Sequence, residues 1–497
     1  MNLNEQGIDY LNSKGLSIEA INTQLDLIRK GTKFLNLVRP ASITDGIIQI
    51  SNIELDKIEK KYSQLISNKT ITKFIPASGA ASRMFKDLYS YLDNGDVNTF
   101  ITTFIAGIKK FAFYNELEQS LKLQNLDIDT LLKTKDYKTI IEFLITDKGL
   151  NYGKLPKGLL SFHKNEDSIS TPIVEHVKEA IAYCGAQPKL SFTISEIFKS
   201  KFETEINKAL KQFNKDFEYQ LSYQKSKTDT VASTSDFNLV ETKNNEFLIR
   251  PGGHGSLIEN LNDVNSDIIF IKNIDNVCSE KYLEETALYK KALVSILLQK
   301  QHTIFNYIEK LEDYDGKDEL LNNKIETFFK EELNIHSDAL LSMNTSEKVQ
   351  FYKAKLNRPI RVCGMVKNEG EPGGGPFWVK DEEDTLGLQI VESLQINLKK
   401  NDQASILSNS SHFNPVDIVC SVKDNNNKKY DLTAFVDKDA VFVTEKSYQG
   451  KTILALEHPG LWNGGMGNWN TIFVEVSSKT FNPVKTVNDL LRDTHQQ

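Results

Sequence analysis

The stretch Thr70-Ile-Thr-Lys-Phe-Ile-Pro-Ala-Ser-Gly-Ala-Ala-Ser-Arg-Met-Phe-Lys-Asp-Leu88 contains three patterns in succession. Residues 70–75 are β-branched or aromatic and favour a strand, small residues fill 76–82, and a helical pattern opens at Arg83. This order is the phosphate-binding arrangement of α/β proteins, because small side chains let backbone N–H groups and a helix N-terminus approach a polyphosphate. An ordinary tight turn between a strand and a helix fits the same residues.

Strand and helix patterns alternate beyond this stretch. Residues 189–194, 217–223 and 361–366 are typical of strands, and residues 196–213 follow the first of them as a helix. Residues 267–272 have the unbroken apolar centre of a strand that is buried on both faces. We therefore predict an α/β, Rossmann-like fold with a mixed, mainly parallel sheet flanked by helices.

The same patterns predict the domain organisation. Residues 1–67 are expected to form an N-terminal helical cap, in which Ser17 begins a helix and Gly31 ends it. Residues 68–497 are expected to form one catalytic domain, with helical insertions at about 87–150 and 280–350.

Composition excludes several classes of protein. Sixty Lys and Arg residues against 67 Asp and Glu residues give a net charge of −7, which argues against a nucleic-acid partner. The sequence has no apolar run of about 18 residues and no basic, apolar leader, so we expect no membrane span and no secretory signal. The four cysteines are too widely spaced for a zinc motif or a dense disulfide framework, and a reducing cytoplasm is the simplest location.

Three further segments have the composition of ligand sites. Asp275 follows the buried strand at 267–272, where it could hold Mg²⁺ or only cap the next helix. The glycine-rich segment 369–379 contains Phe377 and Trp378 and predicts either a ligand-facing lid or a flexible hairpin. The segment 460–470 is dense in glycine, asparagine and tryptophan, which suits it to binding sugar hydroxyls.

Motifs that the sequence lacks narrow the choice further. It has no G-x-x-x-x-G-K-[ST], no G-x-G-x-x-G after a strand, no H-E-x-x-H and no G-x-S-x-G. P-loop NTPases, classical dinucleotide dehydrogenases, zincins and α/β-hydrolases therefore become less favoured.

Taken in order, the motifs resemble those of the sugar nucleotidyltransferases with a GT-A type fold, and especially a bacterial branch of the UDP-sugar pyrophosphorylase group. The matching segments, in chain order, are Ser78-Gly-Ala-Ala-Ser-Arg83-Met84, Pro156-Lys157-Gly-Leu-Leu160, Pro251-Gly-Gly-His254-Gly255, Ile268 to Asn276 with Asp275, Trp469-Asn-Thr-Ile-Phe-Val474 and Phe481-Asn-Pro-Val-Lys485.

The resemblance implies a role for each motif. The triphosphate would bind Ser78, Gly79, Ala80, Ala81 and Ser82; the nucleotide base would bind Gly253, His254, Gly255 and Gln224; the sugar would bind Trp469, Asn470 and Gly374. Arg83, Lys157 and Lys485 would be catalytic, and Asp275 would hold Mg²⁺, with Asp417 as a candidate second ligand. From the residues alone, Gln224 could equally be a surface residue after a strand.

The reaction that the resemblance implies is Mg²⁺-dependent transfer of a nucleotidyl group from an NTP, with UTP expected, to a sugar 1-phosphate. Pyrophosphate and a nucleotide sugar would be the products. A GT-A glycosyltransferase and a non-catalytic nucleotide or sugar sensor are the alternatives. The first usually carries an Asp-x-Asp motif where this chain has Asn273-Ile-Asp275-Asn276, and the second would be expected to lack the charged residues.

Overall fold

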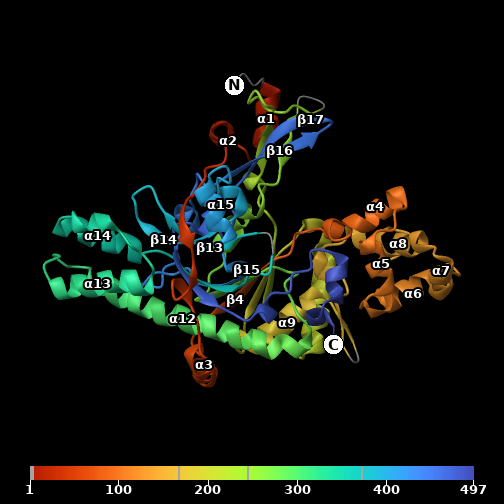
Figure 1. Cartoon of the computed structure of the whole chain (residues 1–497), viewed down its shortest axis with the longest axis horizontal. Helices are drawn as coiled ribbons and strands as arrows, with labels where there is room; N and C mark the ends of the chain where they lie inside the picture. Colours follow the sequence, from red (N-terminus) through yellow and green to blue (C-terminus); the bar gives the residue numbers. More distant parts are fainter. Residues whose placement is uncertain (1–4, 166–167, 243–245, 371–372, 497) are drawn as a thin grey trace. The chain divides into compact units, whose positions relative to one another are not determined.

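The computed structural model describes residues 5–165, 168–242, 246–370 and 373–496. Within it the chain forms two compact units (Figure 1). The first contains Met1–Asp56, Gln224–Phe270 and Leu293–Val476, and the second contains Lys57–Tyr223, Ile271–Ala292 and Ser477–Gln497. Each unit is thus assembled from three separate pieces of the chain. The predicted domain boundary at residues 67 and 68 stays a prediction.

The first unit is built around mainly parallel strands. Their order is β2 (Ser42–Ile43), β3 (Gly46–Ile48), β18 (Asn470–Glu475), β12 (Ile360–Lys367) and β15 (His412–Ser421). All these neighbours are parallel except β12 and β15, which are antiparallel. Nearly every residue of β12 and β15 is buried, as expected for strands covered on both faces.

Two smaller antiparallel sheets belong to the same unit. One has the order β1 (Asn36–Pro40), β13 (Gly375–Lys380), β14 (Leu386–Val391), and the other has the order β10 (Ile249–Arg250), β9 (Thr230–Ser233), β17 (Lys451–Glu457), β16 (Phe442–Tyr448). Because residues 375–379 form β13, with Phe377 and Trp378 buried, the predicted lid or flexible hairpin is wrong for those residues. Residues 371–372 of that segment lie outside the described residues.

The N-terminal helices cover the four-stranded sheet. Helices α1 (Glu5–Ser13) and α2 (Ile18–Lys30) share a hydrophobic cluster with Val231 and Leu456. Ser17 accepts a hydrogen bond from the N–H of Ala20, and Gly31 ends the helix, both as predicted. The N-terminal region is helical, but β1, β2 and β3 lie between α2 and α3 (Asn52–Leu65).

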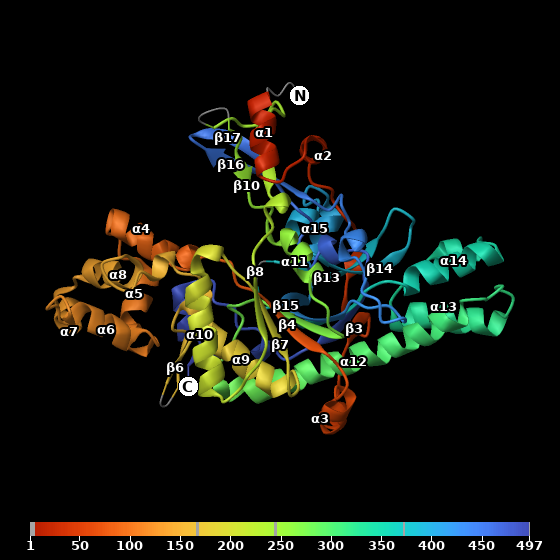
Figure 2. The ribbon, with the colours of Figure 1, turned by 180° about the vertical axis from the view of Figure 1, so that it is seen from behind.

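The remaining helices that begin or end in the first unit are α11 (Ile258–Asn262), α12 (Leu283–Lys310), α13 (Glu319–Glu332), α14 (Thr345–Leu356) and α15 (Asn401–Ser408). The predicted insertion at 280–350 is therefore helical. Helices α13 and α14 lie side by side in both ribbon views (Figures 1 and 2). The rings of Phe329 on α13 and Tyr352 on α14 meet edge to face, with centroids 5.8 Å apart.

The second unit contains a parallel sheet with the order β4 (Ile71–Pro76), β7 (Lys189–Thr193), β8 (Tyr219–Ser222). Helices α9 (Pro172–Tyr183) and α10 (Lys199–Gln212) lie beside these strands (Figure 2). The fully buried β11 (Ile268–Lys272) carries the chain into this unit, and β5 (His163–Lys164) pairs with β6 (Ile169–Ser170). The predicted α/β fold with a mainly parallel sheet is confirmed.

The first predicted insertion is an all-helical part of the second unit, made of α4 (Lys86–Asn94), α5 (Thr99–Ala106), α6 (Tyr114–Lys122), α7 (Ile128–Thr134) and α8 (Tyr137–Ile145). Its hydrophobic core also includes Val277, Val484, Val487 and Leu490. The insertion therefore supports the segment that carries Lys485.

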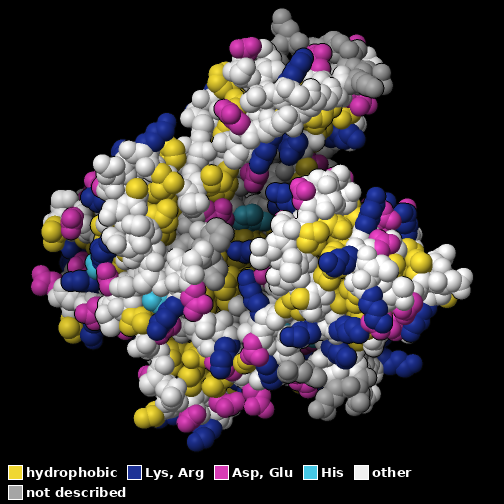
Figure 3. All heavy atoms as spheres, turned by 45° about the vertical axis from the view of Figure 1, so that its right-hand side comes forward, with side chains coloured by type: hydrophobic (Ala, Val, Ile, Leu, Met, Phe, Trp, Pro, Cys, Tyr) yellow, Lys and Arg dark blue, Asp and Glu magenta, His cyan; other side chains and the backbone are white. Residues whose placement is uncertain are grey.

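No helix of the described residues is long and apolar enough to span a membrane. Basic and acidic side chains are interspersed over the face drawn in Figure 3.

Candidate functional site

The loop after β4 leaves backbone N–H groups free. The N–H of Ala77 donates to Thr193 O at 2.8 Å, and the N–H of Ala81 donates to Leu155 O at 3.0 Å. Between these two anchors, residues 78–80 are exposed, and their N–H groups find no hydrogen-bond partner within the described residues. A row of free amides at the end of a strand suits an anion.

Residues 81–83 continue the loop as a short 3₁₀ helix, and α4 begins at Lys86. Ala81 is buried, whereas Ser82 and Arg83 are exposed. The structure therefore places the Arg83 guanidinium in solvent directly after the free amides, and its predicted catalytic role stays a prediction.

The second motif lies against this loop. Ala80 and Pro156 form an isolated antiparallel bridge, and the N–H of Lys157 donates to Gly79 O at 3.5 Å. Lys157 itself begins a 3₁₀ turn, Lys157–Leu159, with extended Pro156 before it. Segments that are about 75 residues apart in sequence are thus neighbours through backbone contacts.

Lys157 joins two further motifs. Its Nζ atom lies 2.5 Å from Oδ2 of Asp275 and 2.6 Å from the carbonyl oxygen of Val484. Both charged side chains keep some exposure, 16% for Lys157 and 19% for Asp275. The structure therefore brings together the loop, Lys157, Asp275 and the segment before Lys485, all within the second unit.

Two hydrogen bonds of Ile274 fix the turn that carries Asp275. The N–H of Ile274 donates to Pro76 O at 3.1 Å, so the turn is tied to the end of β4. The Nε2 atom of His176 lies 3.2 Å from Ile274 O, and His176 is fully buried. Because a carbonyl only accepts, Nε2 must carry the proton.

A buried ion-pair network lies beside His176. Glu179 binds Lys73 at 2.7 Å and Lys272 at 2.6 Å, with all three side chains almost completely buried. Burial alone would raise the pKa of Glu179, but the charges of Lys272 and Lys73 outweigh it and hold the pKa well below its ordinary value. The network connects β4, α9 and the end of β11.

Sequence reasoning missed Glu179 and assigned His176 no role. Lys73 and Lys272 were the available signal, since each is a lysine in an otherwise apolar strand. A buried lysine requires an acidic partner. The sequence could not say which glutamate supplies it.

Lys485 is exposed, but its backbone is held firmly. The N–H groups of Lys485 and Thr486 both donate to Oδ2 of Asp489, at 2.8 and 2.7 Å. The N–H of Val487 donates to Met84 O at 3.1 Å, just after the loop with free amides. The structure thus places Lys485 one residue after the carbonyl that accepts the Lys157 hydrogen bond.

The predicted nucleotide loop lies in the first unit and packs closely. Gly253 has a φ of 78°, which favours glycine, and a Cβ on Gly255 would lie 2.2 Å from the carbonyl oxygen of Pro459. The backbone conformation therefore accounts for Gly253, and close packing accounts for Gly255. The imidazole of His254 between them stacks on the indole of Trp462, with centroids 4.3 Å apart and planes inclined by 15°.

His254 also approaches a carboxylate. Its Nε2 atom lies 3.6 Å from Oε1 of Glu392, and its Nδ1 atom accepts from the N–H of Leu461 at 3.1 Å. Burial favours the neutral form of Glu392, but the side-chain hydrogen bonds from His254 and Asn463 favour the carboxylate, and the pKa of Glu392 is lowered. Gly374 adjoins this pair, since a Cβ built on it would lie 3.6 Å from Cγ of Glu392.

Asn414 lies next to Gly374, because its N–H donates to Gly374 O at 2.8 Å. Its buried Nδ2 atom has no hydrogen-bond partner within the described residues. Sequence reasoning missed Glu392, Asn414 and Trp462. The position of Glu392 directly after β14 was the one usable signal, since strand ends carry ligand residues.

The structure also places two further predicted site residues. The Nε2 atom of Gln224 donates to Asp229 Oδ1 at 3.5 Å on the half-exposed surface after β8. Asp417 is completely buried on β15 opposite Gly364. Their proposed roles in binding nucleotide and metal stay predictions.

Metal-binding groups are sparse in the described part of the chain. No cluster of three or more His, Cys, Asp or Glu side chains is arranged there to hold an ion. Asp275 and Asp417 belong to different units. A metal at Asp275 would take substrate phosphates and water as further ligands.

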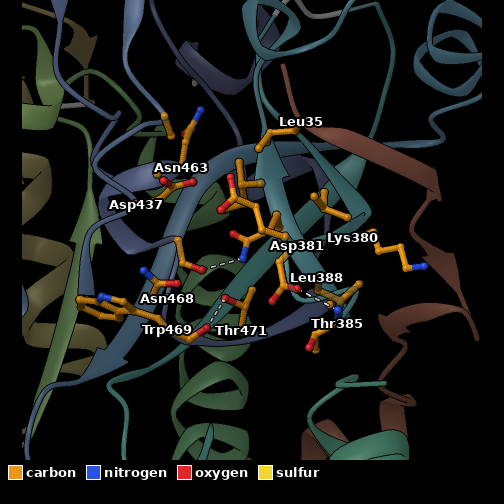
Figure 4. Close-up of a pocket in the computed structure, with 18 of the residues that line it drawn as sticks. Leu35, Lys380, Asp381, Thr385, Leu388, Asp437, Asn463, Asn468, Trp469 and Thr471 are labelled. Atoms are coloured by element: carbon orange, nitrogen blue, oxygen red, sulfur yellow. Dashed lines mark hydrogen bonds between the residues drawn. The ribbon is translucent and has the colours of Figure 1, made fainter. Parts of the chain in front are cut away.

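Trp469 and Asn470 lie at the start of β18, in the first unit. They line a pocket of about 580 Å³ together with Asn463 and Thr471 (Figure 4). The pocket is at the amino ends of β12 and β18, because Ile360 and Asn470 pair at the start of both strands. Open α/β sheets usually bind substrates at the carboxyl ends, so the substrate role of Trp469 and Asn470 stays a prediction.

Comparisons with known proteins give one family and several similar structures, among them two pyrophosphorylases. A family model described as "Domain of unknown function (DUF4301)" matches residues 4–496. The two pyrophosphorylases are a uridine diphosphate N-acetylglucosamine pyrophosphorylase from Trypanosoma brucei, in complex with an inhibitor, and a mutant UDP-glucose pyrophosphorylase from Leishmania major, in complex with UDP-glucose. The first is 12% identical with a TM-score of 0.48, and the match covers 98% of this chain and 81% of the other. The second is 11% identical with a TM-score of 0.42, and the match covers 99% of this chain and 79% of the other. No curated protein matches the chain.

Proposed function

We propose that this chain, which belongs to the family described as Domain of unknown function (DUF4301), transfers a nucleotidyl group from an NTP to a sugar 1-phosphate. The observation that carries the proposal is the position of Lys157. Its ammonium group lies against Asp275 and Val484, and its backbone lies against the loop with free amides. These are four of the six segments whose motifs resemble the nucleotidyltransferases.

The loop amides at residues 78–80 bind the triphosphate. They are exposed, unpaired and consecutive, so they can contact phosphate oxygens without breaking other hydrogen bonds. Arg83 follows on the same loop and carries the positive charge that stabilises the leaving pyrophosphate.

Lys157 stabilises the reacting phosphoryl group. A phosphate oxygen of the sugar 1-phosphate attacks the α-phosphorus, and the bond to the bridging oxygen of pyrophosphate breaks in line. The attacking oxygen is already anionic, so this step needs no general base. Negative charge grows on the phosphoryl oxygens, and an ammonium group next to them lowers the barrier.

Lys485 binds the phosphate of the attacking sugar 1-phosphate. Its side chain is exposed while its backbone is fixed through Asp489, so the charge is available on a rigid segment. Rigid positioning of two reactants removes much of the entropic cost of bringing them together.

Asp275 is the residue that would hold Mg²⁺. Its partly exposed carboxylate gives the hard oxygen ligand that this ion prefers, and a bound ion would neutralise phosphate charge. Oδ2 accepts from Lys157 in this structure, so a cation at Asp275 and the Lys157 ammonium share one carboxylate. The single carboxylate fits an ion whose other ligands are phosphates and water.

The test is pyrophosphate release from the purified full chain. The chain is incubated with each NTP, a panel of sugar 1-phosphates and Mg²⁺. We expect release for at least one pair and a nucleotide sugar as co-product, with both lost in Lys157→Ala. Nucleotide binding without release for any pair would contradict the proposal and favour the glycosyltransferase or sensor alternative.

A further inference from the structure

We propose that the pocket at the amino ends of β12 and β18 is a binding site for a small neutral sugar. All its lining residues belong to the first unit, whereas Lys157, Asp275 and Lys485 belong to the second. None of the phosphate- and metal-binding residues of the proposed nucleotidyl transfer lines the pocket, whereas Trp469 and Asn470, which the resemblance assigns to the substrate sugar, do.

The size of the pocket suits a small ligand. Its volume is about 580 Å³, within the range of about 300–1,000 Å³ that is typical of ligand pockets. Asp437, Asn463 and Asn468 lie along one side and Asp381, Thr385 and Lys380 along the other (Figure 4). The two sides therefore offer carboxylate, amide, hydroxyl and ammonium groups across one space.

Several polar groups of the wall lack partners. The Nε1 atom of Trp469, Nδ2 of Asn470, Oδ1 of Asn463 and Oγ1 of Thr385 have no hydrogen-bond partner within the described residues. Leaving a buried polar atom unpaired costs about 1–3 kcal/mol. A ligand rich in hydroxyls, each able to donate and accept, can supply both kinds of missing partner through small side-chain rotations.

The charges of the wall are balanced, which favours a neutral ligand. Lys33 pairs with Glu382 at 2.7 Å, and the buried Lys355 has the Asp381 carboxylate 3.8 Å away. With Arg358 and Lys380 included, the lining has four basic side chains against five acidic ones, so the pocket lacks the net positive charge that a phosphate or nucleotide would require.

Phe34 provides an apolar surface beside these polar groups. It lines the pocket and is 51% exposed, which is unusual for a phenylalanine. The apolar C–H face of a sugar ring can pack on such an aromatic ring while its hydroxyls meet the polar walls. Trp469, the other aromatic side chain of the lining, is only 4% exposed and forms part of the pocket wall.

The experiment measures binding of glucose, galactose, mannose and N-acetylglucosamine to the full chain by ligand-observed NMR and thermal shift. We expect saturable binding of at least one sugar. Phe34→Ala and Asn468→Ala each weaken it about tenfold or more. Both residues are exposed, so folding should survive, and the unliganded melting temperature verifies this.

Leu341→Ala and Asn426→Ala are the matched controls. Both side chains are exposed and lie outside the pocket lining, so sugar affinity should not change. Retained sugar binding in Lys157→Ala would separate this site from the proposed catalytic one.

Four results would overturn the proposal. The first is no binding of any sugar in the panel, and the second is equal affinity in both pocket variants and the parent protein. The third is competition between the sugar and sugar 1-phosphate substrates. The fourth is binding of uridine or inorganic phosphate at this pocket in preference to every sugar. The third result would make the pocket part of the substrate site, and the fourth would assign it to another ligand class.

Discussion

Lys157 and Asp275, 118 residues apart in sequence, form an ion pair in which Nζ lies 2.5 Å from Oδ2. The carbonyl of Val484 takes a second hydrogen from the same ammonium group at 2.6 Å. In the absence of substrate, each charge neutralises the other. Binding of a polyphosphate would let the ammonium turn to phosphate oxygens, and a cation could then replace it at the carboxylate.

Replacing Lys157 with alanine should therefore lower kcat on the order of 10²–10³-fold, as for other groups that stabilise charge in the transition state. The binding of nucleotide should change much less, because the loop amides remain. Steady-state kinetics of pyrophosphate release would measure both effects. Lys154→Ala is the control, since Lys154 is exposed on the preceding turn and should leave kcat unchanged.

Asp275→Asn should abolish Mg²⁺-dependent turnover while the protein stays folded. The amide keeps the shape of the side chain but removes the negative charge that attracts the ion. Activity would be titrated against Mg²⁺, with circular dichroism to verify folding. Turnover equal to the parent at every Mg²⁺ concentration would show that Asp275 only caps the turn.

Lys485→Ala should raise the KM for the sugar 1-phosphate and leave that for the NTP nearly unchanged. The exposed ammonium is proposed to contact only the attacking substrate, so its loss removes binding of that substrate. Lys479→Ala is a suitable control on the same segment, because Lys479 is half-exposed and pairs with Glu285 at 3.5 Å. Similar KM changes in both variants would contradict the assignment.

The α/β fold and the order of the motifs could be predicted well from the sequence, because both are local patterns. Strand β4, the helix that Ser17 caps and the buried strand β11 all follow from alternation, capping and apolar runs. The prediction failed at residues 375–379, where glycines suggested a loop. There Phe377 and Trp378 are buried between β1 and β14, and this pairing overrides the local signal.

The buried contacts that hold the candidate site in place could not be predicted, because they join residues that are far apart in sequence. Glu179 lies in a helix without a motif, and its position between Lys73 and Lys272 is set only by the packing of α9. Likewise, no local pattern indicates that Val484 accepts a hydrogen bond from Lys157. Such pairings need the tertiary structure, whereas capping and strand patterns do not.

Burial in the core of the helical insertion should contribute strongly to the stability of the protein. Two leucines of the insertion test this, because they are the same residue type with opposite burial. Leu121 is completely buried in the core that also holds Val484, whereas Leu123, two residues on, is 82% exposed. Leu121→Ala should lower the free energy of unfolding by about 2–5 kcal/mol, and Leu123→Ala should change it by less than about 0.5 kcal/mol. Chemical denaturation of both variants would measure the difference.

The buried histidines of the second unit should make stability depend on pH. Burial, with the positive charge of Lys73 adding to it, keeps the pKa of His176 well below 6.5, and burial beside His163 does the same for His495. Both rings are thus neutral in the folded protein at a pH where an unfolded chain already binds protons. Between the folded and unfolded pKa values the unfolded state holds more protons, so stability rises with pH.

Stability should therefore be retained above about pH 6.5 and should fall below it, by up to about 1.4 kcal/mol per pH unit for each histidine. Urea unfolding at pH 7.5, 6.5 and 5.5 would measure this slope. His495→Gln should reduce it by the share of one histidine, whereas His302→Gln, at a partly exposed position on α12, should leave it unchanged. A proton added at Nδ1 of His176 leaves the Nε2–H bond to Ile274 O in place but puts a second positive charge beside Lys73, so low pH should also disturb the turn that holds Asp275. Pyrophosphate release that declines with the fraction of folded protein alone, and no faster, would contradict that last step and leave His176 with a role in stability only.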